Sequence, residues 1–468
     1  MSENQSLYSQ YGLTRNPFPR QGSFPVDTIE EKNYALIFTG RDEVVRKIHE
    51  MINLFRSNAS IPVIFLVGEY GYGKTHALKY IQYRIIDHYA DILPFYIKNI
   101  GEPRPLALYK AILNAIYGAL DKEFFYSCAE KILNERRLLM DFVTKTFPDF
   151  REIIQKLANR NIRALRWLFA EELTPEEKDA LEVVRVISND NADEALIALV
   201  RLIAYGSDKK LVFLIDELES VVGGYTLNDV RKFYEALRNI VDKLSSEAMF
   251  IFAAAPIVVT GDISIGELHP ALLSRIQGDI IELNPLRKDE MKRLFEKYLT
   301  TFRDPKVRQS YERLYPFTED SLDAIYEYSQ GIPRRVLQIA SVVLYEAAKR
   351  NLRVIDSSFI HRLMHRVERA EAEPEEAPLS SETEITISEI LEERAIEQDQ
   401  IIQELDRLER KMYQILKTSA ERSATLSSLA RKIYVTYDAA FEVAKSLERK
   451  GIVLVKRRGS GYRVILRV

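Results

Sequence analysis

Residues 61–75 read IPVIFLVGEYGYGKT, an apolar run that leads directly into a glycine-rich loop. The run from Ile61 to Val67 predicts a buried strand, and the periodicity from Lys74 to about His88 predicts a helix. Between them, Gly68 to Thr75 satisfies the pattern GxxxxGK[ST] in its required strand-loop-helix context. The stretch therefore predicts a P-loop, in which backbone N–H groups and the start of a helix surround phosphates. A chance glycine-rich turn is the alternative, and both flanking elements argue against it.

Each residue type in this loop has an expected role toward ATP and Mg²⁺. The glycines Gly68, Gly71 and Gly73 allow the backbone to curl around the phosphates. Lys74 is expected to reach the β- and γ-phosphates, and Thr75 to offer its hydroxyl to Mg²⁺.

A second apolar run, Leu211 to Ile215, ends in the acid pair Asp216 and Glu217. This is the pattern of a Walker B strand. Asp216 is expected to hold the Mg²⁺ shell, and Glu217 to orient or activate the attacking water as the catalytic acid-base group. Two solvated acids at a strand end are the alternative. Next to a matched P-loop, the pair favours an ATPase that hydrolyses ATP to ADP and phosphate.

Further apolar runs predict the rest of an α/β core. Strands are expected near 92–97, 249–254 and 279–283, and helices between them indicate a parallel sheet. The stretch from about 121 to 205 has helical periodicity and no strand-like run, which predicts a helical insertion. After Pro285 the strands stop, and helices predict a small all-α domain.

The expected organisation has five parts. They are an N-terminal arm over 1–37, a nucleotide-binding core over 38–285, a helical lid over 286–370, an acidic linker over 371–385, and a helix with a winged-helix domain over 386–468.

The C-terminal tail has a charge opposite to that of the remainder. From Arg410 to Val468 there are 14 basic and four acidic residues, a net charge of +10, which leaves −13 on the rest of the chain. The tail predicts three helices, over 408–416, 426–433 and 437–450, and two strands, over 452–455 and 463–466. This order is typical of a winged helix, a DNA-binding fold. A winged helix that binds protein is the alternative.

Five basic residues are expected to contact DNA. They are Lys445, Arg449, Lys456, Arg457 and Arg458, the last three in the wing. Because Asp438 and Glu442 lie where base contacts normally occur, we expect recognition of backbone and shape more than of sequence.

Composition excludes several classes. A single cysteine, Cys128, excludes an internal disulfide, and six scattered histidines predict no structural metal site. The apolar runs are too short to span a membrane. The N-terminus lacks a basic start and an apolar stretch, which argues against a signal peptide and predicts a cytoplasmic location.

Together the two nucleotide motifs resemble the AAA+ superfamily of ATPases. The resemblance implies a sensor 2 arginine within Gly331-Ile332-Pro333-Arg334-Arg335, with Arg334 the first choice and Arg335 the second. It also implies an arginine finger at Arg275 within the segment 268–276, for which a surface salt bridge is the alternative. Such a finger completes a neighbouring subunit's site, so a homo-oligomer is implied. The segment 38–43, which contains Arg41, resembles a box near the adenine pocket of archaeal origin-recognition-type initiators.

One position departs from the AAA+ pattern. The strand that should end in a polar sensor 1 residue reads Phe252-Ala253-Ala254-Ala255-Pro256. Either Thr260 or another group substitutes, or hydrolysis is slow. The loop through His76 and the segments 166–168 and 189–192 also resemble the ATP-binding proteins of BREX phage-defence systems. His76 itself is expected to pack the loop.

The sequence thus predicts an ATP-dependent, DNA-associated AAA+ ATPase that remodels or loads partners on DNA. The alternative is an ATP-gated signalling or phage-defence switch subunit that uses its winged helix for protein contacts. A protein partner is also expected at the insertion, over 121–205.

Overall fold

The computed structural model describes most of the chain, in two compact units. The units are Met1–Arg362 and Leu363–Val468, and each is described by itself. Within the described residues, every helix is too short or too polar to span a bilayer. The described residues are 7–22, 28–59, 63–221, 225–256, 258, 280–368, 386–388, 390, 405, 407–417, 423–433, 435–450, 452–458 and 461–466.

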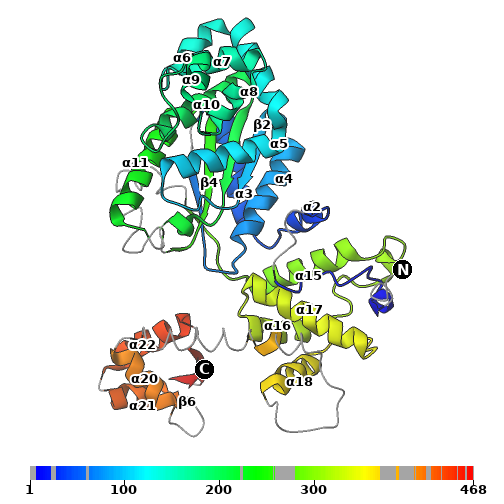
Figure 1. The fold of residues 1–468 in the computed structure, drawn as a ribbon. Helices are drawn as coiled ribbons and strands as arrows, with labels where there is room; N and C mark the ends of the chain where they lie inside the picture. Colours follow the sequence, from blue (N-terminus) through cyan, green and yellow to red (C-terminus); the bar gives the residue numbers. More distant parts are fainter. Residues whose placement is uncertain are drawn as a thin grey trace. The chain divides into compact units, whose positions relative to one another are not determined.

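A five-stranded parallel sheet forms the centre of the first unit (Figure 1). Its order, β2-β3-β4-β1-β5, is that of an AAA+ core and confirms the predicted fold class. β1 lies between β4 and β5, with Val67 opposite Ala254 and Glu282. Crossover connections of this kind bring the carboxyl ends of the strands to one edge. The strands are β1 (Val63–Val67), β2 (Ile92–Ile97), β3 (Lys210–Ile215), β4 (Ala248–Ala254) and β5 (Ile280–Glu282).

Helices cover both faces of this sheet. Alternate strand residues face opposite ways, so Phe65 and Phe213 belong to one apolar cluster and Ile64 and Leu214 to the other. The second cluster includes α3 and α4, and the first includes α5, α10 and α11. Because both faces are buried, the strands are continuous apolar runs. The covering helices are α3 (Asp42–Arg56), α4 (Lys74–His88), α5 (Pro105–Asn134), α10 (Ala192–Ser207) and α11 (Leu227–Lys243).

The predicted helical insertion is confirmed. α5 continues past its expected end at residue 120, but its backbone is interrupted at Asp121, where φ is 57°. Trp167 is buried against Phe147 and Phe150 and donates its indole N–H to the carbonyl of Arg185. Helices α6 to α9 gather around α5 and α10 (Figure 1). The shorter elements here are η2 (Arg137–Leu139), α6 (Met140–Thr144), α7 (Phe150–Ala158), α8 (Ile162–Leu168) and α9 (Pro175–Leu181).

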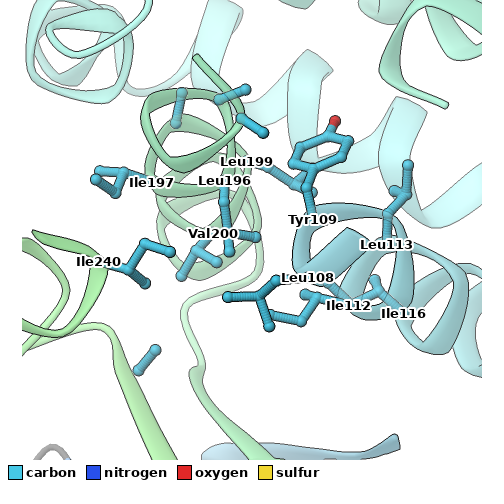
Figure 2. Packing of buried hydrophobic residues seen from close by; sticks show 14 of the residues in the cluster. Leu108, Tyr109, Ile112, Leu113, Ile116, Leu196, Ile197, Leu199, Val200 and Ile240 are labelled. Carbon is cyan, nitrogen blue, oxygen red and sulfur yellow. The ribbon is translucent and has the colours of Figure 1, made fainter. Parts of the chain in front are cut away.

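The insertion shares its core with the sheet through α5 and α10. Figure 2 shows Leu108 and Ile112 of α5 beside Val200 of α10, with Ile240 of α11 nearby. α10 is buried at every position from Ala195 to Ala204. It is therefore a central helix of this unit.

An all-α lid follows the sheet, as predicted. The N-terminal segment packs on it, since the ring of Phe18 lies 5.0 Å from that of Phe295 and 5.6 Å from that of Tyr298, between centroids. The elements of the lid and of the N-terminal segment are η1 (Ser9–Tyr11), α2 (Glu31–Ala35), α15 (Lys288–Phe302), η4 (Arg308–Ser310), α16 (Glu319–Ser329), α17 (Pro333–Lys349) and α18 (Ser357–Glu368).

The second unit has the helices and hairpin of a winged helix. Two details differ from expectation. The strands of the wing are longer, so Lys456, Arg457 and Arg458 lie in β7 and not in the turn, and a short strand β6 pairs with β8. Its elements are α20 (Arg407–Lys417), β6 (Ser423–Thr425), α21 (Leu426–Ile433), α22 (Tyr437–Arg449), β7 (Val453–Arg458) and β8 (Gly461–Leu466). The predicted linker over 371–385 lies outside the described residues.

Burial in the insertion makes a stability prediction. Leu199 of α10 is fully buried and Leu138 is 96% exposed. We expect Leu199→Ala to lower the free energy of unfolding by about 2–5 kcal/mol, because it leaves a cavity. Leu138→Ala, the matched control, should change it by less than about 0.5 kcal/mol. Urea unfolding followed by circular dichroism measures both, and equal effects would contradict the position of α10 in the core.

Candidate functional site

The predicted P-loop lies where β1 leaves the sheet. The N–H of Gly68 donates to the carbonyl of Ala254 at 3.2 Å, which ties the start of the loop to the end of β4. Gly73 caps α4 with φ 90°, a left-handed conformation that favours glycine. The backbone angle and not a lack of space favours glycine here, because a Cβ at this position would meet no atom within 4 Å. The first turn of α4 thus begins directly at Lys74, and the backbone N–H groups of this turn have no hydrogen-bond acceptor within the helix.

The ammonium of Lys74 lies inside the loop. Its Nζ donates to the carbonyls of Gly68 at 2.7 Å and Glu69 at 3.4 Å. The same nitrogen lies 3.9 Å from Oε1 of Glu219, and the side chain is 11% exposed. A positive charge is therefore held within the ring of backbone that is expected to receive phosphate.

Thr75 and Asp216 meet in this site. The hydroxyl of Thr75 lies beside the carboxylate of Asp216, which is 2% exposed. Asp216 accepts from the backbone N–H of Glu217 at 2.9 Å and from the hydroxyl of Tyr96 at 3.1 Å. Burial raises the pKa of Asp216, although the hydrogen bonds that it accepts oppose the shift. A hydroxyl and a carboxylate side by side are a donor set that fits Mg²⁺.

Glu217 directly follows this buried acid but differs from it. Its side chain is exposed, and its φ of 49° places it in the left-handed region. The chain turns there into η3 (Leu218–Val221). The role of Glu217 in orienting water stays a prediction.

Arg41 connects the P-loop to the segment that follows β5. One guanidinium nitrogen, Nη2, donates to the carbonyls of Tyr72 at 2.9 Å and Asn284 at 2.7 Å. Burial lowers the pKa of Arg41 to about 10. The residue predicted to bind nucleotide thus holds the P-loop against the segment after β5.

Arg334 of the lid reaches the P-loop from α17. Its backbone N–H donates to the carbonyl of Gly71 at 3.2 Å. Its guanidinium lies 4.6 Å above the ring centre of Tyr70 and donates to the hydroxyl of that ring. The second choice for this role, Arg335, is buried in the lid. The other predicted catalytic arginine, Arg275, lies outside the described residues, as does Thr260.

A series of contacting side chains runs from α2 to Asp216, the predicted Mg²⁺ ligand. Lys79 of α4 and Glu31 of α2 form a buried ion pair of 3.0 Å. The Lys79 ammonium lies 3.8 Å from the ring centre of Tyr96, which donates to Asp216. Sequence reasoning missed Tyr96, Glu31 and Glu219. None of the three belongs to a motif. Glu219 could have been predicted as a site residue, because it is charged and lies only three residues after Asp216.

His76 contacts α2, the helix that also contains Glu31. Its Nε2 lies 3.1 Å from the carbonyls of Tyr34 and Ala35 and donates to them. This contact agrees with the predicted packing role. Burial lowers the pKa of His76 to about 4, and the charge of Arg41 acts in the same direction.

The predicted DNA contacts lie on α22 and β7. Lys456 and Arg457 are exposed, whereas the Lys445 ammonium pairs with Glu448 at 2.6 Å. Arg449 ends α22 and Arg458 ends β7. Lys456 is directly opposite Arg463 on β8.

Fold and site together define a P-loop NTPase domain with the strand order of an AAA+ core. Residues 41–267 match the KAP family P-loop domain. A curated relative, an uncharacterised HTH-type transcriptional regulator of Methanocaldococcus jannaschii, is 28% identical over 158 residues. The match covers 34% of this chain and 35% of that protein, so this chain spans about a third of the length of the relative.

Two solved structures are similar over most of the chain. The ORC2 protein of Aeropyrum pernix is 13% identical with a TM-score of 0.46, over 91% of this chain and 89% of that one. The RuvB Holliday junction branch migration motor of Thermotoga maritima is 14% identical with a TM-score of 0.37, over 97% of this chain and 96% of that one.

The neutral His76 makes stability depend on pH. The ordinary pKa is 6.5 and the folded value about 4, so between these pH values the unfolded chain binds a proton that the folded chain does not. The free energy of unfolding should therefore fall as pH drops from about 6.5 toward 4. In His76→Gln, whose amide can still donate to a carbonyl, this part of the loss should disappear.

Urea unfolding midpoints at pH 7 and pH 4.5 test this dependence. His88→Gln is the control, because the side chain of His88 is exposed. If wild type and His76→Gln lose the same stability, His76 does not contribute.

Proposed function

We propose that this protein is an ATP-dependent, DNA-associated AAA+ ATPase that remodels or loads partners on DNA through its winged helix. The observation that carries the proposal is the contact between Thr75 and Asp216. It joins the first turn after the P-loop to the end of β3, which is the arrangement that binding of Mg²⁺ and triphosphate requires.

The described residues fit the nucleotide and its metal. Mg²⁺ would be held by Thr75 and Asp216 and would neutralise charge on the phosphates. The Lys74 ammonium, already in the loop, would turn from the carbonyl of Gly68 to the β- and γ-phosphates. Arg334 is the sensor 2 candidate, because it already contacts Gly71 and Tyr70 at the loop.

The remaining assignments extend this proposal. Glu217 orients the attacking water, and Arg275 acts on the site of a neighbouring subunit in a homo-oligomer. The insertion offers a surface for a protein partner, since Leu138 and Val184 are exposed there.

Two substitutions test binding and hydrolysis separately. Lys74→Ala should weaken ATP binding by about tenfold or more, because it removes the charge within the loop. Glu217→Gln should keep binding and lower the hydrolysis rate by roughly 100-fold. Fluorescence titration with labelled ATP and a Mg²⁺-dependent ATPase assay, with and without DNA, measure the two effects. Sizing with and without ATP tests the oligomer. Full binding by Lys74→Ala would exclude this site.

The second candidate is an ATP-gated switch. It is favoured by the apolar end of β4, where Ala254 and Ala255 provide no polar side chain. A switch needs binding alone, so Glu217→Gln would retain cellular function while Lys74→Ala would lose it. Loss in both variants favours the motor.

The wing supports an anionic partner. Lys456 and Arg463 are cross-strand neighbours, and like charges directly opposite each other destabilise a strand pair. One guanidinium nitrogen of Arg463, Nε, already donates a hydrogen bond to the hydroxyl of Ser423 at 3.1 Å. A phosphate backbone along the hairpin would relieve the repulsion.

Charge reversal tests this contact. Lys456→Glu combined with Arg457→Glu should weaken binding to duplex DNA by about 10- to 100-fold and reduce the salt slope by about 2. The hairpin should stay folded, because Glu at 456 would face Arg463. Fluorescence anisotropy at several salt concentrations measures the effect, with the exposed Lys232→Glu of α11 as the control. Unchanged affinity would favour a winged helix that binds protein.

A further inference from the structure

Glu219 connects two parts of the nucleotide site. Its Oε2 accepts a hydrogen bond from the backbone N–H of Ala255 at 3.0 Å. Its Oε1 lies 3.9 Å from Nζ of Lys74. One carboxylate therefore reaches both the residue that follows β4 and the lysine of the P-loop.

At this place the described residues that end and follow β4, Ala254 and Ala255, have no polar side chain. Ala254 is opposite Val67 in the sheet, and its carbonyl accepts from the N–H of Gly68. The end of β4 therefore borders the start of the P-loop. Since Ala254 and Ala255 offer only backbone groups there, a carboxylate from η3 provides the side-chain polar atoms.

The local backbone explains how Glu219 reaches this point. The left-handed φ of Glu217 turns the chain into η3 immediately after Asp216. Leu218 and Val221 are fully buried in the apolar core and anchor the turn. Glu219, between these anchors, is half-buried and contacts the loop.

We propose that Glu219 is the positioning residue that replaces the polar sensor of β4. Through one oxygen it fixes the N–H of Ala255, and through the other it balances the charge of Lys74 while the lysine lies in the loop. When Lys74 turns to a bound triphosphate, Glu219 keeps the N–H of Ala255 in place beside the start of the P-loop. This role rests on the proposed ATP hydrolysis.

Glu219→Ala separates this role from nucleotide binding. The variant should keep the Kd for labelled ATP within about threefold, because Lys74, Thr75 and Asp216 remain. Its single-turnover hydrolysis rate should fall about tenfold or more, because the groups around the phosphate lose their alignment. Glu219→Gln, which keeps an oxygen for Ala255 but removes the charge, should lie between wild type and Glu219→Ala.

A second substitution distinguishes positioning from general support of the fold. Ala255→Asn restores a polar side chain at the end of β4, so adding it to Glu219→Ala should recover part of the rate. It should not rescue Glu217→Gln, whose defect is different. Glu235→Ala, exposed on α11, is the matched control.

The outcomes separate this inference from the proposed function. An inactive wild-type protein would overturn the ATPase itself. If the wild type is active, three results would overturn the role of Glu219 alone. They are an unchanged hydrolysis rate in Glu219→Ala, a parallel loss of ATP binding in that variant, and no recovery of the rate with Ala255→Asn.

Discussion

The parallel register of β3, β4 and β1 is the constraint on which the site depends. It places Ile215, Ala254 and Val67, the last residues of three strands, along one edge of the sheet. Each strand then delivers a different group: β3 gives Asp216, β4 gives the backbone of Ala255, and β1 gives the P-loop. Because the strands are buried on both faces, a one-residue slip would exchange the side chains of the two apolar clusters and disrupt the packing of both. The proximity of Thr75 to Asp216 is a direct consequence of this register.

The P-loop itself is held mainly by side chains that donate to backbone carbonyls. Arg41 binds the carbonyl of Tyr72, Lys74 binds that of Gly68, and the backbone of Arg334 binds that of Gly71. These donors come from the core and from the lid, so the conformation of the loop depends on the packing of both. A loop held in this way is preorganised for phosphate, which reduces the ordering that binding requires. The N-terminal segment contributes as well, since α2 contacts α4 through His76 and the buried pair of Lys79 and Glu31.

Charge divides the chain into a body of −13 and a tail of +10. In the tail, repeated basic residues remain exposed on β7, and Lys456 faces Arg463 across the hairpin. In the body, by contrast, Asp216 is buried, and the nearby Lys79 and Glu31 form a buried ion pair. The exposed charges of the tail are available for the proposed contact with an extended anion, whereas the buried charges fix the geometry of the site.

The sequence by itself determined the α/β core, the P-loop, the Asp216 strand, the helical insertion and the helices of the tail. Their signals are local, because strand and helix periodicity and the loop pattern each lie within about 15 residues. Only the tertiary structure decided which distant groups meet. Arg41, whose role at the nucleotide stays a prediction, donates to the carbonyl of Tyr72 in the P-loop. Tyr96 reaches Asp216 from 120 positions away, and the wing's basic residues lie in a strand. Glu219 joins Lys74 and Ala255 because β3, β4 and β1 are neighbours in space. That order depends on how the crossovers pack, and no single segment of the sequence encodes it.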